Sequence, residues 1–358
     1  MGIKALARPE ILAMKPYSSA RKEAPGEGIL LNANEAPWSL IDEPGALNRY
    51  PDPQPSGLLS RLADLYSVPE EFLLATRGSD EGIDLLTRVF CQAGQDAILQ
   101  CPPTFGMYKI AAQTQGAEII SVNRNADDGF SLDRQAVLDA VQKNPQIKLI
   151  FLTSPNNPTG DIIDPAFLQQ LLQLTRDRSL VVMDEAYAEF CDHPSATSQV
   201  SEFEHLVVLR TLSKAWAAAG LRCGAVIAQP TVIDLLRRVI APYPLPGPVV
   251  NLAMRMLEKP VLKKQQKSLA CLKVNKQNLL DSLRGMSFIR EILPGEANFV
   301  LIRVDNPDEV LEYCASKGVI IRGFPADPLL ADYIRISIGS EKDLAALLST
   351  FGQWEASK

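Results

Sequence analysis

Histidine, paired cysteines and long apolar runs are scarce in this 358-residue chain. Its two histidines, His193 and His205, do not follow a metal-ligand spacing, so metal catalysis is not expected. The six cysteines include no Cys-x-x-Cys pair, which is typical of reduced thiols and argues against a zinc site or a disulfide framework. No apolar run approaches membrane-spanning length, and the N-terminus lacks the apolar core of a signal peptide. We therefore expect a cytoplasmic protein without a membrane partner.

Positive charge is also in short supply, because 36 lysines and arginines face 42 aspartates and glutamates, for a net charge of -6. This balance argues against a nucleic-acid-binding surface. Hydrophobic residues make up 46% of the chain and charged residues 22%, as in ordinary globular proteins, and the length allows more than one domain. The composition therefore indicates a folded protein but no particular partner.

One lysine carries the strongest functional signal. The apolar stretch 206–209 is typical of a buried strand and leads into Thr211, Ser213 and Lys214, and Arg222 follows eight residues later. A lysine leaving a buried strand has a lowered pKa and can form a Schiff base with an aldehyde, while hydroxyls and an arginine suit a phosphate. An aldehyde and a phosphate in one molecule indicate pyridoxal 5'-phosphate (PLP). The alternative is a solvated surface lysine, since Ser-Lys pairs are frequent by chance.

Two further strand ends carry side chains that suit the same cofactor. The apolar stretch 180–183 ends in Asp184, where a buried carboxylate would keep a proton on the PLP ring nitrogen, and Tyr187 could hydrogen-bond the phenolic oxygen. The strand pattern 148–153 ends in the turn Ser-Pro-Asn-Asn-Pro-Thr-Gly. This turn displays Asn157, whose amide can donate to the phenolic oxygen without adding charge. The alternatives are a solvated acidic pair and a plain turn.

With these three motifs in the same order and at approximately the same spacing, the chain resembles the fold-type I, class II PLP-dependent aminotransferases over nearly its whole length. Within that family it is most similar to the histidinol-phosphate aminotransferases. The stretches that carry this closer resemblance are residues 31–35, 48–51, 77–81, 101–108, 241–245 and 333–339. The resemblance implies PLP as cofactor, a homodimer, L-histidinol phosphate as amino donor and 2-oxoglutarate as amino acceptor, in histidine biosynthesis.

Strand and helix patterns alternate between about residues 75 and 250. This alternation predicts an α/β fold with a mainly parallel seven-stranded sheet covered by helices. The strand patterns lie at residues 97–101, 118–122, 148–153, 180–184, 206–211 and 225–228. The helical patterns between them lie at residues 83–90, 105–115, 132–143 and 165–176.

The chain is expected to form three parts. Residues 1–45 have little periodicity and are predicted to be an arm that packs on another surface, either the small domain or a partner subunit. Residues 46–250 would form the large PLP-binding domain, with a short helix at 233–240, and residues 251–358 a small α+β domain. The small domain is predicted to contain a long polar helix at 260–283, strands at 298–304, 319–322 and 333–338, and a helix at 307–316.

A glycine turn at residues 77–78 leads into a helical pattern, whose free N–H groups would suit an anion. Ser79 and Asp80 are therefore candidates for binding the PLP phosphate through their backbones, although both residue types are also ordinary helix caps. The resemblance implies that Phe105 stacks on the PLP ring, where relatives commonly have tyrosine, so the tyrosine hydroxyl is absent. It also implies that Tyr50 reaches the cofactor phosphate of the other subunit, so that each site needs two chains.

The same resemblance implies how the substrates are bound. Arg335 would hold their anionic group, because a guanidinium can grip either a carboxylate or a phosphate in bidentate fashion. Arg322 and Tyr17 would lie beside it around a phosphate. Asn34 and Glu35 are candidates for contact with an imidazole ring. Without the resemblance, a solvated strand arginine would be the simpler interpretation of Arg335.

These roles predict an aminotransferase in which Lys214 first holds PLP and then, once freed, acts as the general base. Two alternatives on the same fold stay open, namely an aromatic amino-acid aminotransferase and a phospho-amino-acid decarboxylase. A transcription regulator with an aminotransferase-like domain is disfavoured, because the N-terminal arm of about 45 residues is too short and irregular for a DNA-binding module.

Overall fold

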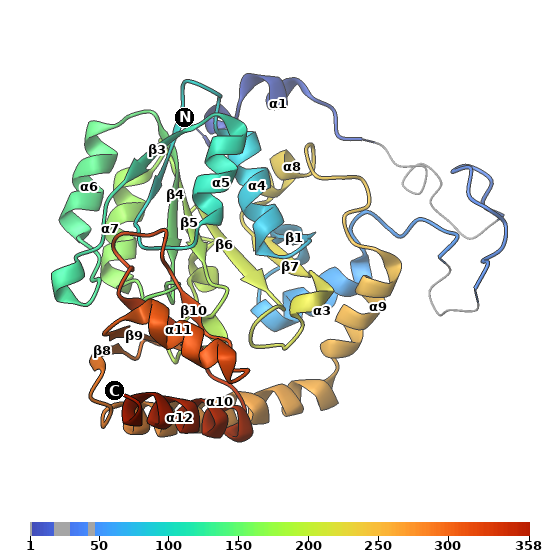
Figure 1. Ribbon diagram of the computed structural model, residues 1–358. Helices are drawn as coiled ribbons and strands as arrows, with labels where there is room; N and C mark the ends of the chain where they lie inside the picture. The colour runs from blue at the N-terminus through green and yellow to red at the C-terminus, as the bar shows by residue number, and fades with distance from the viewer. Residues whose placement is uncertain (1, 18–28, 42–46) are drawn as a thin grey trace.

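The computed structural model describes residues 2–17, 29–41 and 47–358, and its main element is a seven-stranded sheet (Figure 1). In spatial order its strands are β1 (Leu73–Thr76), β7 (Gly224–Ile227), β6 (Leu206–Thr211), β5 (Leu180–Asp184), β4 (Ile147–Thr153), β2 (Ala97–Gln100) and β3 (Glu118–Ser121). Strand β7 alone runs opposite to the other six strands, and all residues of the central strands β5 and β6 are buried. The predicted mainly parallel seven-stranded sheet is therefore confirmed.

Helices cover both faces of this sheet and form two apolar cores with it. One face is covered by α3 (Ser56–Tyr66), α6 (Arg134–Lys143), α7 (Pro165–Thr175) and α9 (Gly247–Met256). The other face is covered by α4 (Ser79–Phe90), α5 (Met107–Gln115) and α8 (Pro230–Leu236). Local sequence sets several helix starts: Asp133 caps α6 by accepting from the backbone N–H of Ala136, and Asp164 caps α7 immediately before Pro165.

A second, antiparallel sheet lies beside the carboxyl ends of the main strands (Figure 1). Its strands, in spatial order, are β10 (Arg322–Gly323), β11 (Tyr333–Ser337), β9 (Phe299–Val304) and β8 (Ile289–Leu293). It packs against α10 (Lys259–Leu283), α11 (Pro307–Ser316) and α12 (Glu341–Ala356) around a third core. The predicted smaller α+β part is thus confirmed. Of the helices described, none combines the length and apolarity needed to cross a membrane.

Several elements differ from the sequence prediction. Strands β1 and β8 were not predicted, and the strand expected at 319–322 is reduced to the two residues of β10. The helix expected at 233–240 begins earlier, at Pro230, and ends at Leu236. Helix α9 was also not predicted; Pro248 occupies its first turn, where no backbone N–H is needed.

The first residues of the chain pack on its own core, which corrects the prediction of an arm that packs elsewhere. A 3-10 turn η1 (Ile3–Leu6) and the short helix α1 (Pro9–Ala13) bury apolar side chains against the α4/α5/α8 face. The guanidinium of Arg238 also donates to the carbonyl of Leu12 at 2.8 Å. Residues 29–41, in contrast, lie at the side of the molecule beyond α9 and leave Ile29 and Leu31 exposed (Figure 1).

Candidate active site

A cavity of about 570 Å³ lies where the carboxyl ends of β4, β5 and β6 face the second sheet. Parallel strands bring their carboxyl ends to one edge, which is where α/β proteins place ligands. The predicted site residues that line the cavity are Ser79, Asp80, Phe105, Asn157, Asp184, Tyr187, Thr211, Ser213, Lys214, Arg222, Arg322 and Arg335. The structure therefore brings most of the predicted site together from both sheets.

Lys214 follows β6 and is exposed to this cavity. Desolvation by the surrounding protein lowers the pKa of its amine, and the positive charge of Arg335 lowers it further. Its Nζ lies 5.6 Å from the centre of the Tyr187 ring. A lysine with a lowered pKa holds a larger fraction of neutral amine, so Lys214 is suited to attack a carbonyl carbon or to accept a proton.

Asp184 ends β5 and is only 2% exposed. Burial raises the pKa of its carboxyl to about 6, against the opposing effect of two donors. The Tyr108 hydroxyl donates to Oδ2 at 2.7 Å, and the backbone N–H of Ala186 donates to Oδ1 at 3.1 Å. The carboxyl group is thus held in one orientation and faces the cavity that contains Lys214.

An anion cradle forms one end of the cavity. Helix α4 begins there after Gly78, so its first backbone N–H groups lack partners within the helix. Arg222 donates to Asp80 Oδ2 at 3.1 Å and to Ser213 Oγ at 3.3 Å. Gly78 has a φ of +78°, and a Cβ at that position would meet Arg222 Nη2 at 2.8 Å. Free helix amides, a hydroxyl and a guanidinium around a glycine form a site that fits a phosphate.

At the other end of the cavity, two arginines come from the second sheet. Arg322 on β10 and Arg335 on β11 are direct neighbours across the two strands. Burial lowers the pKa of Arg335, and the charge of Arg322 contributes in the same direction. Arg335 donates to Asn157 Oδ1 at 2.5 Å, and the Asn157 amide donates to the Tyr187 hydroxyl at 3.4 Å. This contact joins the second sheet to the turn that follows β4.

The sequence profile of the class I and II aminotransferases matches residues 17–351. The chain belongs to this aminotransferase family. It is 42% identical to the histidinol-phosphate aminotransferase of Pectobacterium atrosepticum, over 98% of both chains. It is 41% identical to that of Cronobacter sakazakii, over 96% of this chain and 94% of the relative. The solved structure of histidinol-phosphate aminotransferase from Sinorhizobium meliloti in complex with pyridoxal-5'-phosphate has the same fold, with a TM-score of 0.78 at 20% identity over 86% of this chain and 83% of that one.

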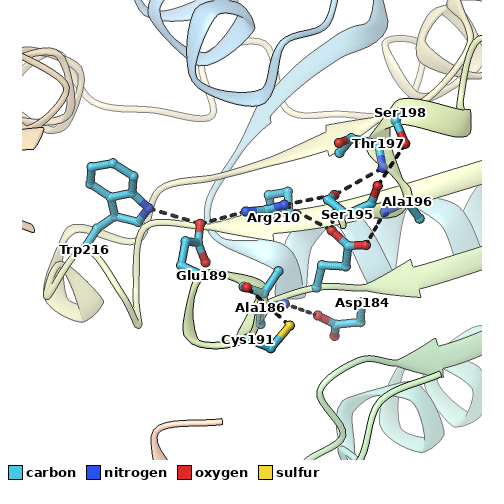
Figure 2. Close-up of polar contacts among 12 residues, drawn as sticks. Asp184, Ala186, Glu189, Cys191, Ser195, Ala196, Thr197, Ser198, Arg210 and Trp216 are labelled. Carbon is cyan, nitrogen blue, oxygen red and sulfur yellow. Dashed lines mark hydrogen bonds and ion pairs between the residues drawn. The ribbon is translucent and has the colours of Figure 1, made fainter. Parts of the chain in front are cut away.

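Next to the cavity residue Asp184, this aminotransferase has a buried charge network that was not predicted from the sequence (Figure 2). Arg210 on β6 donates to Glu185 Oε2 at 3.0 Å and to Glu189 Oε1 at 2.8 Å. The Trp216 indole N–H donates to the same Glu189 oxygen at 3.2 Å. The network therefore ties the segment that follows Asp184 to the segment that contains Lys214. A charged residue within the apolar pattern 206–211 was the available signal.

The remaining predicted site residues of the aminotransferase lie outside the cavity of their own chain. They are Tyr17, Asn34, Glu35 and Tyr50. Three of them line a separate cavity of about 410 Å³. There Glu35 accepts from Arg49 at 2.8 Å and from the backbone N–H of Tyr50 at 2.7 Å, while the Tyr50 ring stacks on Tyr243. Their roles in binding cofactor or substrate stay predictions.

Proposed function

We propose that this aminotransferase uses PLP, with L-histidinol phosphate as amino donor and 2-oxoglutarate as amino acceptor. The observation that carries the proposal is the pair Arg322 and Arg335 in the same cavity as Lys214. Two guanidinium groups opposite each other suit a doubly charged phosphate, and one of them can grip a carboxylate. The curated relatives at 42% and 41% identity, which are named for histidinol phosphate, support the same choice.

The residues present fit PLP. Lys214 would hold the cofactor covalently, and the α4 N-terminus with Ser213 and Arg222 would bind its phosphate. Asp184 would accept a hydrogen bond from the protonated ring nitrogen. Asn157 and Tyr187, which are already hydrogen-bonded to each other, would both reach the phenolic oxygen. Burial raises the pKa of Tyr187 to about 12, so its hydroxyl remains a donor at neutral pH.

Bound PLP would supply the electron sink that makes the substrate Cα proton acidic. The chain's own contribution is to place a base at that proton and to fix the substrate. Once its amine is free, Lys214 Nζ would be the base that takes the proton from the substrate Cα and holds it for the later protonation. Arg335 would hold the anionic end of either substrate, and its bond to Asn157 would set where that end lies relative to Lys214.

The two alternative activities differ in what the arginine pair binds. An aromatic amino-acid aminotransferase would use it for a carboxylate, and a phospho-amino-acid decarboxylase for a phosphate while the Cα carboxylate is lost. In the decarboxylase the Cα–carboxylate bond, and not the Cα–H bond, is the one that breaks. Donor preference and carbon dioxide release therefore separate the three activities.

We further propose that the active unit is a homodimer. Ile29, Leu31, Trp38 and Leu40 are all strongly exposed in the described segment 29–41. Exposed apolar side chains gathered on one segment are typical of a contact surface. In such a dimer Tyr50, Asn34 and Glu35 of one subunit would complete the cavity of the other.

A reducing compartment such as the cytoplasm is proposed for this enzyme. All six cysteines are free thiols in the structure. Burial raises the pKa of Cys91, Cys101 and Cys223 to about 12 in each case, so these thiols stay protonated and unreactive. Core thiols of this kind are typical of proteins that are not stabilised by disulfides.

A single half-reaction without keto acid tests the proposed function. The protein is loaded with PLP, mixed with L-histidinol phosphate, and followed by the visible absorption of the bound cofactor. We expect rapid conversion to the amino form of the cofactor, no conversion with Lys214→Ala, and normal conversion with Lys273→Ala, whose lysine pairs with Asp192 outside the cavity. Conversion by phenylalanine but not by histidinol phosphate would assign the aromatic activity, and carbon dioxide release from a carboxylated phospho-amino acid would assign the decarboxylase.

A further inference from the structure

Tyr108 is a fully buried tyrosine that lies next to the active site without lining it. It belongs to the first turn of α5, and its ring stacks on Phe151 with a centroid distance of 4.7 Å and an interplanar angle of 9°. Phe105, which lines the cavity, packs edge-on against the same ring at 5.8 Å. The tyrosine ring is therefore fixed on two sides, and its hydroxyl has a defined direction.

That hydroxyl reaches two side chains at the strand ends. It donates to Asp184 Oδ2 at 2.7 Å, and Thr153 Oγ1 lies 2.7 Å from the Tyr108 hydroxyl oxygen. A phenolic hydroxyl has one proton. Because this proton is directed to Asp184, Thr153 must donate to Tyr108. The three groups form a directional chain, Thr153 to Tyr108 to Asp184, in which each hydrogen bond polarises the next.

The Tyr108 hydroxyl and the Asp184 carboxyl differ in how they ionise. Burial raises the pKa of Tyr108 well above its ordinary value, so the hydroxyl remains a donor at any physiological pH. Burial also raises the pKa of Asp184 to about 6, and the charges of Asp80 and Glu185 add to this effect. The Tyr108 hydroxyl acts in the opposite direction, because it donates to the charged form of the carboxyl.

We propose that Tyr108, oriented by Thr153, is a positioning residue that holds the Asp184 carboxylate as an ionised and correctly oriented acceptor for the ring nitrogen of PLP. The inference rests on the proposed function, because it concerns the same cofactor site. Tyr108 does not touch the cavity and acts only through Asp184. A tyrosine that served the core alone would need its ring but not its hydroxyl.

The chain offers a matched control in Tyr66, which is also buried. Among the described residues, the Tyr66 hydroxyl has no hydrogen-bond partner. Tyr66→Phe and Tyr108→Phe therefore remove the same atom from two buried rings, and only the second change removes a donor to Asp184. Thr153→Val is a second variant that keeps the tyrosine but removes the group that orients its hydroxyl.

The first measurement is the pKa of Asp184 in the PLP-free protein, followed by carbon-13 NMR of labelled aspartate and assigned with Asp184→Asn. In Tyr108→Phe we expect the proton affinity of Asp184 to rise about tenfold, since one hydrogen bond to a charged group contributes roughly this factor. Thr153→Val should shift it in the same direction by less, and Tyr66→Phe should leave it unchanged. An equal pKa of Asp184 in Tyr108→Phe and Tyr66→Phe would overturn the inference.

The second measurement is the dissociation constant of PLP. Tyr108→Phe should weaken PLP binding about tenfold, whereas in an Asp184→Asn background the same change should have little further effect, because the two residues act as a unit. Full additivity of the two changes would contradict the inference. Failure of the wild-type protein to bind PLP would overturn the proposed function as well, whereas normal wild-type binding with an unaffected Tyr108→Phe overturns this inference alone.

Discussion

Arg322 and Arg335 have like charges directly opposite each other on β10 and β11. Such a pair is unfavourable across two strands unless an anion lies between the side chains. Arg335 also packs over the Phe299 ring at 5.3 Å, which restricts its guanidinium while leaving it in the cavity. At the residue scale, a bound anion would relieve the repulsion between the two guanidinium groups, which makes the pair a site for an anionic substrate.

Replacing Arg335 with glutamine removes the charge and the bidentate donor. We expect the KM for histidinol phosphate and for 2-oxoglutarate to rise by about two orders of magnitude, because loss of a partner in a charge-assisted pair costs about 2–5 kcal/mol. The matched control is Arg303→Gln on the same sheet, since Arg303 lies near Glu291 and does not line the cavity. The test is steady-state kinetics of both variants with both substrates. If Arg335→Gln and Arg303→Gln had equal KM values, Arg335 would not bind the anion.

The site residues themselves were predictable to different degrees. Asp184, Asn157 and Lys214 each follow an apolar strand pattern, and parallel strands of one sheet bring their carboxyl ends together. Tyr108 and Arg210 were not predicted, because their partners lie 76 and 25 positions away in the sequence. The charge of Arg210 within an apolar pattern signals a buried partner but not which residue it is, and nothing local to Tyr108 signals a partner at all.

At the scale of elements, the buried network around Arg210 connects β6 to the segment that directly follows β5 (Figure 2). Glu185 also accepts from the backbone N–H of Ala196 at 2.7 Å, so the loop after β5 is held at two points. Burial raises the pKa of Glu185, and the charge of Arg210 opposes that rise. The network thus keeps the segments that carry Asp184 and Lys214 in register.

Arg210→Met would leave the buried Glu185 and the partly buried Glu189 without their cation. We expect the free energy of unfolding at neutral pH to fall by about 3–5 kcal/mol, the usual cost of removing one partner of a buried pair. Without Arg210 the folded-state pKa of Glu185 rises further above its unfolded value, so the folded protein binds the proton more tightly. The variant therefore loses stability as pH rises through the folded-state pKa of Glu185. Its free energy of unfolding comes closer to that of the wild type as pH is lowered.

Urea unfolding of wild type and Arg210→Met over a range of pH measures this effect. The control is Arg290→Met, which breaks the surface pair with Asp305 and should change stability little at any pH. A deficit that is independent of pH would indicate lost packing of the Arg210 side chain and not an unpaired Glu185.

The elements differ in how well they could be predicted from their own sequences. Strands β4, β5 and β6 are mostly apolar and were predicted nearly to the residue. Strand β1 has only four residues, and it pairs antiparallel with β7, from which it is separated by more than a hundred residues. A short strand gains its stability from that distant partner, so its own sequence has little periodicity to detect.

At the scale of the whole molecule, four of the predicted site residues lie outside the cavity of their own chain. Tyr50 stacks on Tyr243 beside the separate cavity, and residues 29–41 expose apolar side chains nearby. These features support the proposed homodimer, in which Tyr50 would contact the cofactor phosphate held by the other subunit.

Subunit complementation tests this arrangement. Tyr50→Ala and Lys214→Ala should each impair activity, but a mixture refolded together should regain about a quarter of the wild-type activity, because half of the dimers then contain one intact site. The control mixture is Lys214→Ala with Arg335→Gln. Both residues line the cavity of the same chain, so no mixed dimer would have an intact site. Equal activities of the two mixtures would contradict a site shared between chains.

The sequence by itself determined the fold class and the edge of the sheet at which the chemistry lies. It does so because apolar strand runs and the polar residues that end them are local features of the chain. Only the tertiary structure decided which side chains meet across that edge. Arg335 contacts Asn157 over 178 positions, and Tyr108 donates to Asp184 from a helix on one face of the sheet. Contacts of this kind depend on how helices and sheets pack, because the direction of a side chain follows from the elements around it.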